Sequence, residues 1–399
     1  MARTSRRSTR GKLRASQTVP AVVVGGTLNS LGVVRSLAPA GIPIYVLDIS
    51  RQCAAAWSRH CQFVRTPSLE GPALIEALTA LANRLGARPV LILTSDDSVT
   101  TVSQERQCLE GLYRLSLPAR DMVAALADKS TFHALALREG FPVPRSVWLG
   151  EEAHLSRIRT LAPPLVVKPA DKVLVLNGIV DRAVRAESTA EAEAAASRML
   201  RRSPRLIVQE WVEGPDTEIF FTLFACDPQS RVIGLFPGRK VVCSPPAIGT
   251  TAVCVAAPEV ADELTRETLN FIARTSYRGL GSLEFKRDAR TGAFFIIEPT
   301  VGRTDWQEEI ATLCGVNLPL LAYCNETGVQ EPLATSRRSG LVAWRSSREI
   351  AIPQASRTQG LRVFDGYLRW SDPIPAIYHY GYERFTQRIW RRATSKRGR

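Results

Sequence analysis

Two glutamates in the second half of the chain are placed so that they could hold a divalent metal ion. Glu284 lies in the apolar run Gly281–Lys286, and Glu298 directly follows the apolar run Ala293–Ile297. The turn-forming residues Asp288–Gly292 between the runs predict an antiparallel hairpin on which both carboxylates can point to one face. Neighbouring carboxylates repel each other without a cation, and Mg²⁺ prefers such oxygen ligands. We therefore predict a magnesium site at this pair; the alternative is two unrelated acids at the hairpin ends.

A lysine farther upstream is suited to bind a polyphosphate. Lys168 ends the apolar run Leu165–Val167, which is typical of a short buried strand. An exposed lysine is usually only a solvated charge, but one that closes a buried strand needs a specific partner. An ammonium group binds phosphate oxygens as a compact point charge, so a polyphosphate fits this position. Another lysine, Lys129, follows Asp128 at the start of a predicted helix that ends before Gly140–Pro144.

An acid-bearing connector follows the predicted strand Leu206–Val212. The connector, Glu213–Asp216, contains two acids, a glycine and a proline. Such a segment can offer backbone N–H and C=O groups to the edge of an adenine, and carboxylates after it can accept hydrogen bonds from ribose hydroxyls. The alternative is a surface loop with ordinary acids.

The elements that must position these residues begin with an alternation of strands and helices. The apolar runs Val19–Val24, Ile42–Leu47 and Pro89–Leu93 alternate with helix-like stretches at Ser30–Ala38 and Pro72–Leu85. This alternation predicts a parallel, doubly wound sheet. From about Leu126 onward, short strands and single helices instead predict an α+β arrangement.

The glycine turn after the first strand suggests a nicotinamide-binding site only at first sight. Counted from Gly25, the positions where a dinucleotide fingerprint needs its other glycines hold Thr27 and Ser30. Only glycine allows the close approach to a pyrophosphate, so a nicotinamide oxidoreductase is disfavoured. We instead expect Gly25–Asn29 and Asp96–Asp97, at the carboxyl ends of strands, to help hold a substrate.

The net charge of +14 belongs to the two ends of the chain. Residues 1–18 carry six Lys/Arg and residues 384–399 carry seven, with no acid in either segment, so the rest of the chain is almost neutral. Solvated tails are the simplest interpretation, and contact with an anionic surface or polyanion is the alternative. The eight cysteines lack metal-ligand spacing, so we expect reduced thiols. No apolar run approaches the roughly 18 residues that a membrane helix needs, and the start lacks the hydrophobic stretch of a secretory signal, so we expect a cytoplasmic location.

In their order, these features resemble the ATP-grasp superfamily, especially its carboxylate–amine ligases. The likeness covers roughly residues 20–330. It implies a fold of α/β and α+β type, in which an N-terminal Rossmann-like pre-ATP-grasp domain precedes a two-subdomain ATP-grasp fold. The expected division is a basic tail (1–18), the pre-ATP-grasp domain (19–125), subdomain A (126–205), subdomain B (206–330) and a C-terminal extension with a basic tail (331–399).

The resemblance also implies a role for each candidate residue. ATP would be bound by Lys129 and Lys168 at the α- and β-phosphates, by Glu210 and Val212 at the adenine, and by Asp216 or Glu218 at the ribose. Gln209 would also belong to the ATP site. The metal ligands would be Glu284, Glu298 and Thr300. The catalytic residues would be Lys240, on the transferring phosphate, and Arg303, on the acyl-phosphate or the substrate carboxylate.

One position departs from the family pattern. Many members read Glu-x-Asn-Pro-Arg where this chain has Thr300 in the segment Glu298–Arg303. An asparagine oxygen is a better ligand for Mg²⁺ than a threonine hydroxyl, so we expect one well-formed metal site.

The activity that the resemblance implies is an ATP-dependent ligation of a carboxylate to an amine. The amide would form through an acyl-phosphate, with ADP and phosphate released and Mg²⁺ or Mn²⁺ required. The alternatives are a catalytically weak ATP-binding regulatory module and an ATP-grasp enzyme with a different acceptor. The expected partners are small molecules, with no specific nucleic acid.

Overall fold

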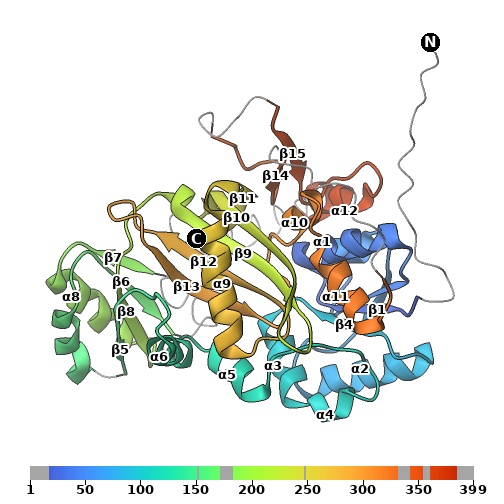
Figure 1. Ribbon diagram of the computed structural model, residues 1–399, viewed down its shortest axis with the longest axis horizontal. Coiled ribbons are helices and arrows are strands. Elements are labelled where there is room, and N and C mark those ends of the chain that lie inside the picture. Colours follow the sequence, from blue (N-terminus) through green and yellow to red (C-terminus); the bar gives the residue numbers. More distant parts are fainter. Residues whose placement is uncertain are drawn as a thin grey trace, which may run out of the picture.

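A computed structural model describes residues 18–150, 152–170, 183–246, 249–330, 342–353 and 360–383. The two predicted basic tails lie outside these ranges, apart from Thr18. The described chain forms three sheets and the helices that pack on them (Figure 1). Within these ranges, no helix is both long and apolar enough to cross a membrane.

The N-terminal part is a parallel sheet with the strand order β3-β2-β1-β4. Its strands are β1 (Ala21–Val24), β2 (Ile44–Asp48), β3 (Gln62–Arg65) and β4 (Val90–Leu93), and its helices are α1 (Leu28–Leu37), α2 (Gly71–Leu85), α3 (Asp96–Gln104) and α4 (Arg106–Leu109). Every residue of β1 is buried, as expected for an inner strand of a parallel sheet. The predicted parallel sheet is confirmed, and β3 is an additional edge strand.

The glycine turn after β1 has a steric explanation. Gly25 has a φ of +100°, and a Cβ atom there would come within 2.5 Å of the Thr94 hydroxyl oxygen. That hydroxyl donates a hydrogen bond to the carbonyl of Val24 at 2.6 Å. Glycine is therefore required where the chain leaves β1 and passes the end of β4.

A smaller antiparallel sheet follows, with the strand order β5-β8-β6-β7. Its strands are β5 (Ser146–Leu149), β6 (Leu165–Pro169), β7 (Val184–Ala186) and β8 (Leu206–Glu210). The helices α5 (Arg120–Ala127) and α6 (Lys129–Glu139) precede it, and η4 (Glu152–Thr160) and α8 (Thr189–Leu200) pack on it. α8 is alanine-rich because its buried face, with Ala192, Ala195 and Ala196, lies directly against the sheet.

The largest sheet has the strand order β13-β12-β9-β10-β11-β14-β15. Its strands are β9 (Ile219–Cys226), β10 (Val232–Ser244), β11 (Thr250–Ala256), β12 (Gly279–Arg287), β13 (Phe294–Val301), β14 (Val342–Arg345) and β15 (Arg362–Asp365). The associated helices are α9 (Ala261–Thr275), α10 (Glu309–Leu313), α11 (Leu318–Thr327) and α12 (Ile374–Ile377), with short turns η3 (Ala54–Trp57) and η5 (Asp216–Glu218) elsewhere. β14 and β15 come from the region predicted as a C-terminal extension and continue this sheet.

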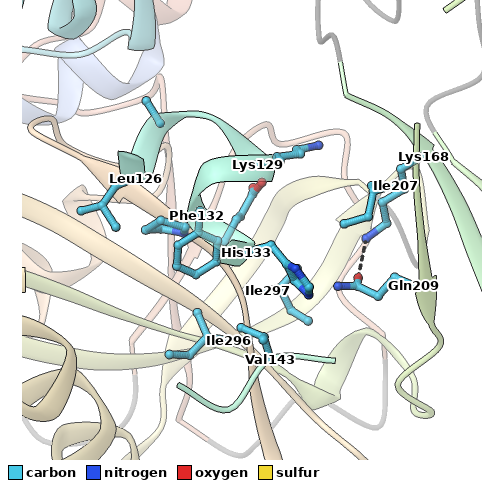
Figure 2. A pocket seen from close by; sticks show the side chains of 13 residues that line it. Leu126, Lys129, Phe132, His133, Val143, Lys168, Ile207, Gln209, Ile296 and Ile297 are labelled. Atoms are coloured by element: carbon cyan, nitrogen blue, oxygen red, sulfur yellow. Dashed lines mark hydrogen bonds between the residues drawn. The ribbon is translucent and has the colours of Figure 1, made fainter. Parts of the chain in front are cut away.

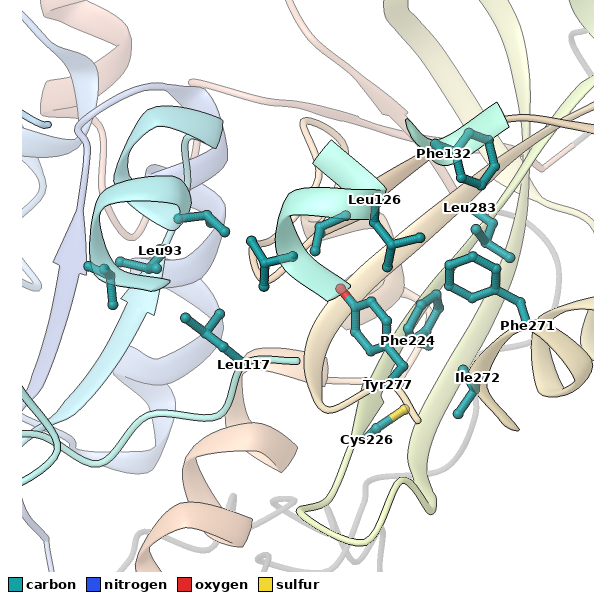
Figure 3. Close-up of a cluster of buried hydrophobic side chains, with 14 of the residues drawn as sticks. Leu93, Leu117, Leu126, Phe132, Phe224, Cys226, Phe271, Ile272, Tyr277 and Leu283 are labelled. Carbon is teal, nitrogen blue, oxygen red and sulfur yellow. The ribbon is translucent and has the colours of Figure 1, made fainter. Parts of the chain in front are cut away.

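One hydrophobic core connects the N-terminal sheet to the largest sheet. It runs from Leu93 on β4, through Leu126 on α5, to Phe224 on β9 and Phe271 on α9 (Figure 3). Phe224 packs edge-on against Tyr277 at 5.1 Å between ring centroids. This continuous packing fixes the carboxyl ends of the parallel strands relative to β12 and β13.

Buried ion pairs attach the C-terminal segment to helix α1 and to α10. Arg35 on α1 contacts Asp372 at 3.1 Å, and both side chains are almost fully buried. Asp372 also accepts hydrogen bonds from the Ser58 hydroxyl and the Arg59 backbone N–H. Glu309 on α10 contacts Arg369 at 2.8 Å. The segment that contains α12 is therefore part of the packed fold.

Candidate functional site

A cavity of about 610 Å³ opens where the three sheets meet. Its wall includes residues from the carboxyl ends of the parallel strands, from β6 and β8 of the smaller sheet, and from β10, β12 and β13 of the largest sheet. The predicted site residues that line it are Lys129, Lys168, Gln209, Glu210, Val212, Lys240, Glu284, Glu298, Thr300 and Arg303. The structure thus brings together residues that are up to 174 positions apart in the sequence.

The two glutamates lie directly opposite each other on the predicted hairpin. Glu284 on β12 pairs with Glu298 on β13, and the next pair along the strands is Phe285 with Ile296. Ile297 is therefore an extra residue, a β-bulge, and it lines the cavity beside Glu298. Both carboxylates consequently face the cavity.

A buried lysine contacts one of these glutamates. Lys240 on β10 is 4% exposed and donates a short hydrogen bond to the Glu284 carboxylate. Burial lowers the pKa of Lys240, but the Glu284 carboxylate outweighs this effect and raises the pKa overall. Burial raises the pKa of Glu284, the Lys240 ammonium opposes this, and the carboxylate of Glu298 raises it further. The ammonium therefore neutralises part of the negative charge at the pair.

The donor set fits a Mg²⁺ ion. Glu284, Glu298 and the Thr300 hydroxyl all line one wall of the cavity, and oxygen is the element that Mg²⁺ prefers to bind. In the described part of the chain, no three His, Cys, Asp or Glu side chains cluster closely enough to hold a metal ion by themselves. An ion here would therefore complete its coordination with water or substrate oxygens, as Mg²⁺ commonly does.

The predicted phosphate-binding lysines, Lys129 and Lys168, both line the cavity and extend from α6 and β6 (Figure 2). Lys129 is the first residue of α6. The Asp128 carboxylate caps this helix by accepting hydrogen bonds from the backbone N–H groups of Ser130 and Thr131. Lys168 on β6 lies 3.4 Å from the side-chain oxygen of Gln209 on β8. Two lysine side chains from different elements therefore line the same cavity.

A histidine that the sequence analysis passed over lies beside these lysines. His133 is 8% exposed and lines a small adjoining cavity of about 70 Å³, together with Lys129, Lys168 and Ile297 (Figure 2). Burial lowers its pKa, and a hydrogen bond with the Pro144 backbone opposes the shift. Its position one helical turn after Lys129 was the signal available in the sequence.

The two residues predicted for the ribose do not line the cavity. The Asp216 carboxylate accepts a hydrogen bond from the Cys243 backbone N–H at 2.8 Å. Glu218 forms a bidentate ion pair with Arg287 on β12, with nitrogen–oxygen distances of 2.5 and 3.1 Å. The structure therefore engages both acids in contacts within the fold.

Lys286 lines the cavity although the sequence analysis gave it no role. It is two residues after Glu284 on β12, so both side chains point to the same face of the strand. Its ammonium group donates to the carbonyls of Gly214 and Pro215, at 2.7 and 2.8 Å. Lys286 thereby fixes the connector after β8. Burial lowers its pKa.

The remaining wall faces the N-terminal sheet. Asp96 and Asp97 start α3, and the Arg303 guanidinium contacts the Asp96 carboxylate at 2.5 Å. Burial lowers the pKa of Arg303, but Asp96 outweighs this effect and raises it. Asp305, which no motif in the sequence marks, also lines the cavity, and its carboxylate accepts hydrogen bonds from Ser282 and from Gln307. This wall combines one cation with three carboxylates.

No model of a protein family and no curated protein matches the sequence. Several solved structures resemble the fold. An N5-carboxyaminoimidazole synthetase from Staphylococcus aureus complexed with ADP has a TM-score of 0.62 and 14% identity, over 80% of each chain.

Two further solved structures also resemble the fold. The biotin carboxylase domain of the Hydrogenobacter thermophilus 2-oxoglutarate carboxylase, in complex with MgADP, ADP and bicarbonate, has a TM-score of 0.59 and 16% identity, over 80% of this chain and 72% of that one. Phosphoribosylglycinamide synthetase from Anaerococcus prevotii has a TM-score of 0.59 and 12% identity, over 80% and 79%. The chain therefore has the ATP-grasp fold, as predicted, and identities this low show the fold alone.

Proposed function

We propose that this protein is an ATP-dependent ligase that joins a carboxylate to an amine through an acyl-phosphate. The observation that carries the proposal is the cavity of about 610 Å³, which is lined both by lysines from two elements and by a pair of glutamates. A polyphosphate needs cations for its oxygens, and two acids beside it need a metal. The solved structures with ADP and MgADP are consistent with this arrangement.

In the first step, an oxygen of the substrate carboxylate would attack the γ-phosphorus of ATP, and the bond to the ADP oxygen would break. Lys129 and Lys168 would bind phosphate oxygens and align the nucleotide. Mg²⁺, held by Glu284 and Glu298, would neutralise charge on the transferring group. Phosphoryl transfer depends mainly on such positioning and charge stabilisation.

In the second step, the amine nitrogen would attack the acyl carbon, and the carbon–oxygen bond to phosphate would break. A proton leaves the nitrogen as the amide forms. Arg303 lies at the wall shared with the N-terminal sheet, where its N–H groups could stabilise the developing oxyanion. Asp96, Asp97 and Asp305 on the same wall favour an amine that arrives as an ammonium ion, which would first give up one proton to solvent to become the nucleophile.

Two observations favour a second function, nucleotide binding with little turnover. Glu284 is already paired with Lys240, and Thr300 is a weaker ligand than the asparagine common in ligases of this type. A regulatory module that binds ATP but turns it over slowly is therefore the second candidate.

The test is a turnover assay with the full chain. Purified protein is incubated with ATP, Mg²⁺ and a pool of amino acids, and the release of ADP and phosphate is measured. If the protein is the proposed ligase, ADP and phosphate will be released only when both a carboxylate and an amine are present. Glu298→Gln should abolish this release, and Glu76→Gln, at an exposed acid on α2 away from the cavity, should not.

Two results would overturn the proposal. Tight ATP binding with no turnover under any substrate pair would support the regulatory module. Turnover that persists in Glu298→Gln at the parent rate would show that the metal site is elsewhere.

A further inference from the structure

Large apolar side chains are exposed together on the C-terminal segment. Trp370 is 90% exposed, Ile377 67% and Ile374 46%. Trp57 on η3 is 38% exposed and stacks on Tyr378 at 5.2 Å, so it adjoins the same segment. We call Trp57, Trp370, Ile374 and Ile377 the α12 patch. Half of the large hydrophobic side chains that are exposed in the described ranges belong to it.

The α12 patch is held in place by buried polar contacts. Asp372, between Trp370 and Ile374, is 1% exposed and is bonded to Arg35 and to the Ser58 hydroxyl. Figure 1 shows α12 beside α1, and α12 also contacts η3. The apolar side chains are therefore displayed by a fixed part of the fold, and Ile374 and Ile377 share one face of α12 because they are three residues apart.

The surroundings of the α12 patch are basic. Arg51 and Arg59 are exposed on either side of η3, and the Arg51 guanidinium lies 5.8 Å from the Trp57 ring centroid. The acid-free basic segment 384–399 begins seven residues after Ile377 and contains Phe385, Ile389 and Trp390 among seven Lys/Arg. Apolar and cationic groups thus adjoin each other, in the structure and along the chain.

We propose that the α12 patch docks on an anionic lipid surface. Tryptophan places its apolar ring in the interface while its N–H stays near water, and isoleucine side chains gain free energy on entering the acyl boundary. Neighbouring arginines are attracted to anionic headgroups, and basic residues next to an apolar anchor are the combination that peripheral attachment needs. This surface is separate from the cavity of the proposed ligase, and the inference is independent of it.

The test is co-sedimentation of the full chain with vesicles. One preparation is phosphatidylcholine alone, and the other is phosphatidylcholine mixed with phosphatidylglycerol. We expect binding to the anionic vesicles only, and weaker binding at high salt because the headgroup attraction is screened. Trp370→Ser combined with Ile377→Ser should weaken vesicle binding by about tenfold or more, because two anchors are lost.

The matched control removes apolar side chains exposed elsewhere. Leu137→Ser combined with Leu269→Ser changes residues that are 64% and 46% exposed on α6 and α9, and it should bind like the parent. Circular dichroism confirms that both double variants are folded. Equal binding to neutral and anionic vesicles, no binding to either, or parent-like binding of the Trp370/Ile377 variant would each refute the proposal.

Other occupants of the α12 patch would give distinct results. If a second copy of the chain covers it, sedimentation velocity will show a dimer that the Trp370/Ile377 variant loses. If residues 384–399 cover it, Trp370 will be protected from acrylamide quenching without vesicles. If a nucleic acid covers it, DNA will bind to the parent and the Trp370/Ile377 variant will lose this binding. Each result would replace the lipid surface.

Discussion

Removing the charge of Lys240 should destabilise the protein because Glu284 would lose its buried partner. The Lys240 side chain is 5% exposed and the Glu284 side chain 24% exposed. Removing one member of a buried ion pair costs about 3 to 5 kcal/mol, mostly because a buried charge is left unpaired. The Glu284 carboxylate remains partly exposed to the cavity, so the cost should lie at the lower end of this range. We expect Lys240→Met to lower the free energy of unfolding by about 3 kcal/mol.

A double-mutant cycle separates this pairing from a simple loss of packing. Lys240→Met, Glu284→Leu and the combined variant are unfolded in urea, and their free energies of unfolding are compared. If the cost of each single variant is an unpaired buried charge, the combined variant should lie within about 1 kcal/mol of the parent, since apolar replacement of a buried pair is often neutral. A combined cost equal to the sum of the single costs would refute the pairing.

Three further predictions concern residues of the cavity and of the small cavity beside it. Lys168→Ala should raise the ATP dissociation constant about tenfold or more, measured by calorimetry, whereas Arg198→Ala on the exposed face of α8 should not. Thr300→Asn should tighten Mg²⁺ binding in the presence of nucleotide, measured by metal titration, and unchanged affinity would show that residue 300 is not a ligand. His133→Leu should lessen the loss of stability as the pH falls, measured by urea unfolding between about pH 7.5 and about pH 5.5.

The sign of the His133 effect follows from proton linkage. Burial lowers the pKa of His133 in the folded state, so the unfolded chain binds the proton first as the pH falls. The parent therefore loses stability below the ordinary histidine pKa of about 6.5. The leucine variant has no imidazole at this position and does not lose stability in this way. Equal pH dependence in parent and variant would contradict the burial argument. His154→Leu on η4 is the control for removing a histidine.

The main elements of the fold were predictable because their signals are local. The buried run of β1, the alternation with α1 and α2, and the β12–β13 hairpin each depend on neighbouring residues. Edge strands carried weaker signals. β3 reads Gln-Phe-Val-Arg and is partly exposed, so its composition does not differ from that of a loop. β14 and β15 are short and include arginines; β14 pairs with the edge of β11, and β15 pairs with β14.

The site residues that escaped prediction depend on contacts between distant segments. Lys286 was visible at the end of its strand, yet its role follows from the carbonyls of Gly214 and Pro215 about 70 positions earlier. Asp305 enters the cavity wall because Ser282 and Gln307 orient its carboxylate. A sequence pattern reports the secondary structure of such residues but carries no information on which distant atoms they meet.

Glu298 illustrates how one irregularity decides the chemistry of a strand. Phe294 and Ile296 face the core, so strict alternation would direct the side chain of residue 298 to the core as well. The bulge at Ile297 adds one residue against β12 and reverses the alternation, which places Glu298 and Thr300 on the cavity side while Val301 returns to the core. On β12, by contrast, regular alternation already buries Leu283 and Phe285 and directs Glu284 to the cavity. The two carboxylates therefore meet only because the bulge lies between Ile296 and Glu298.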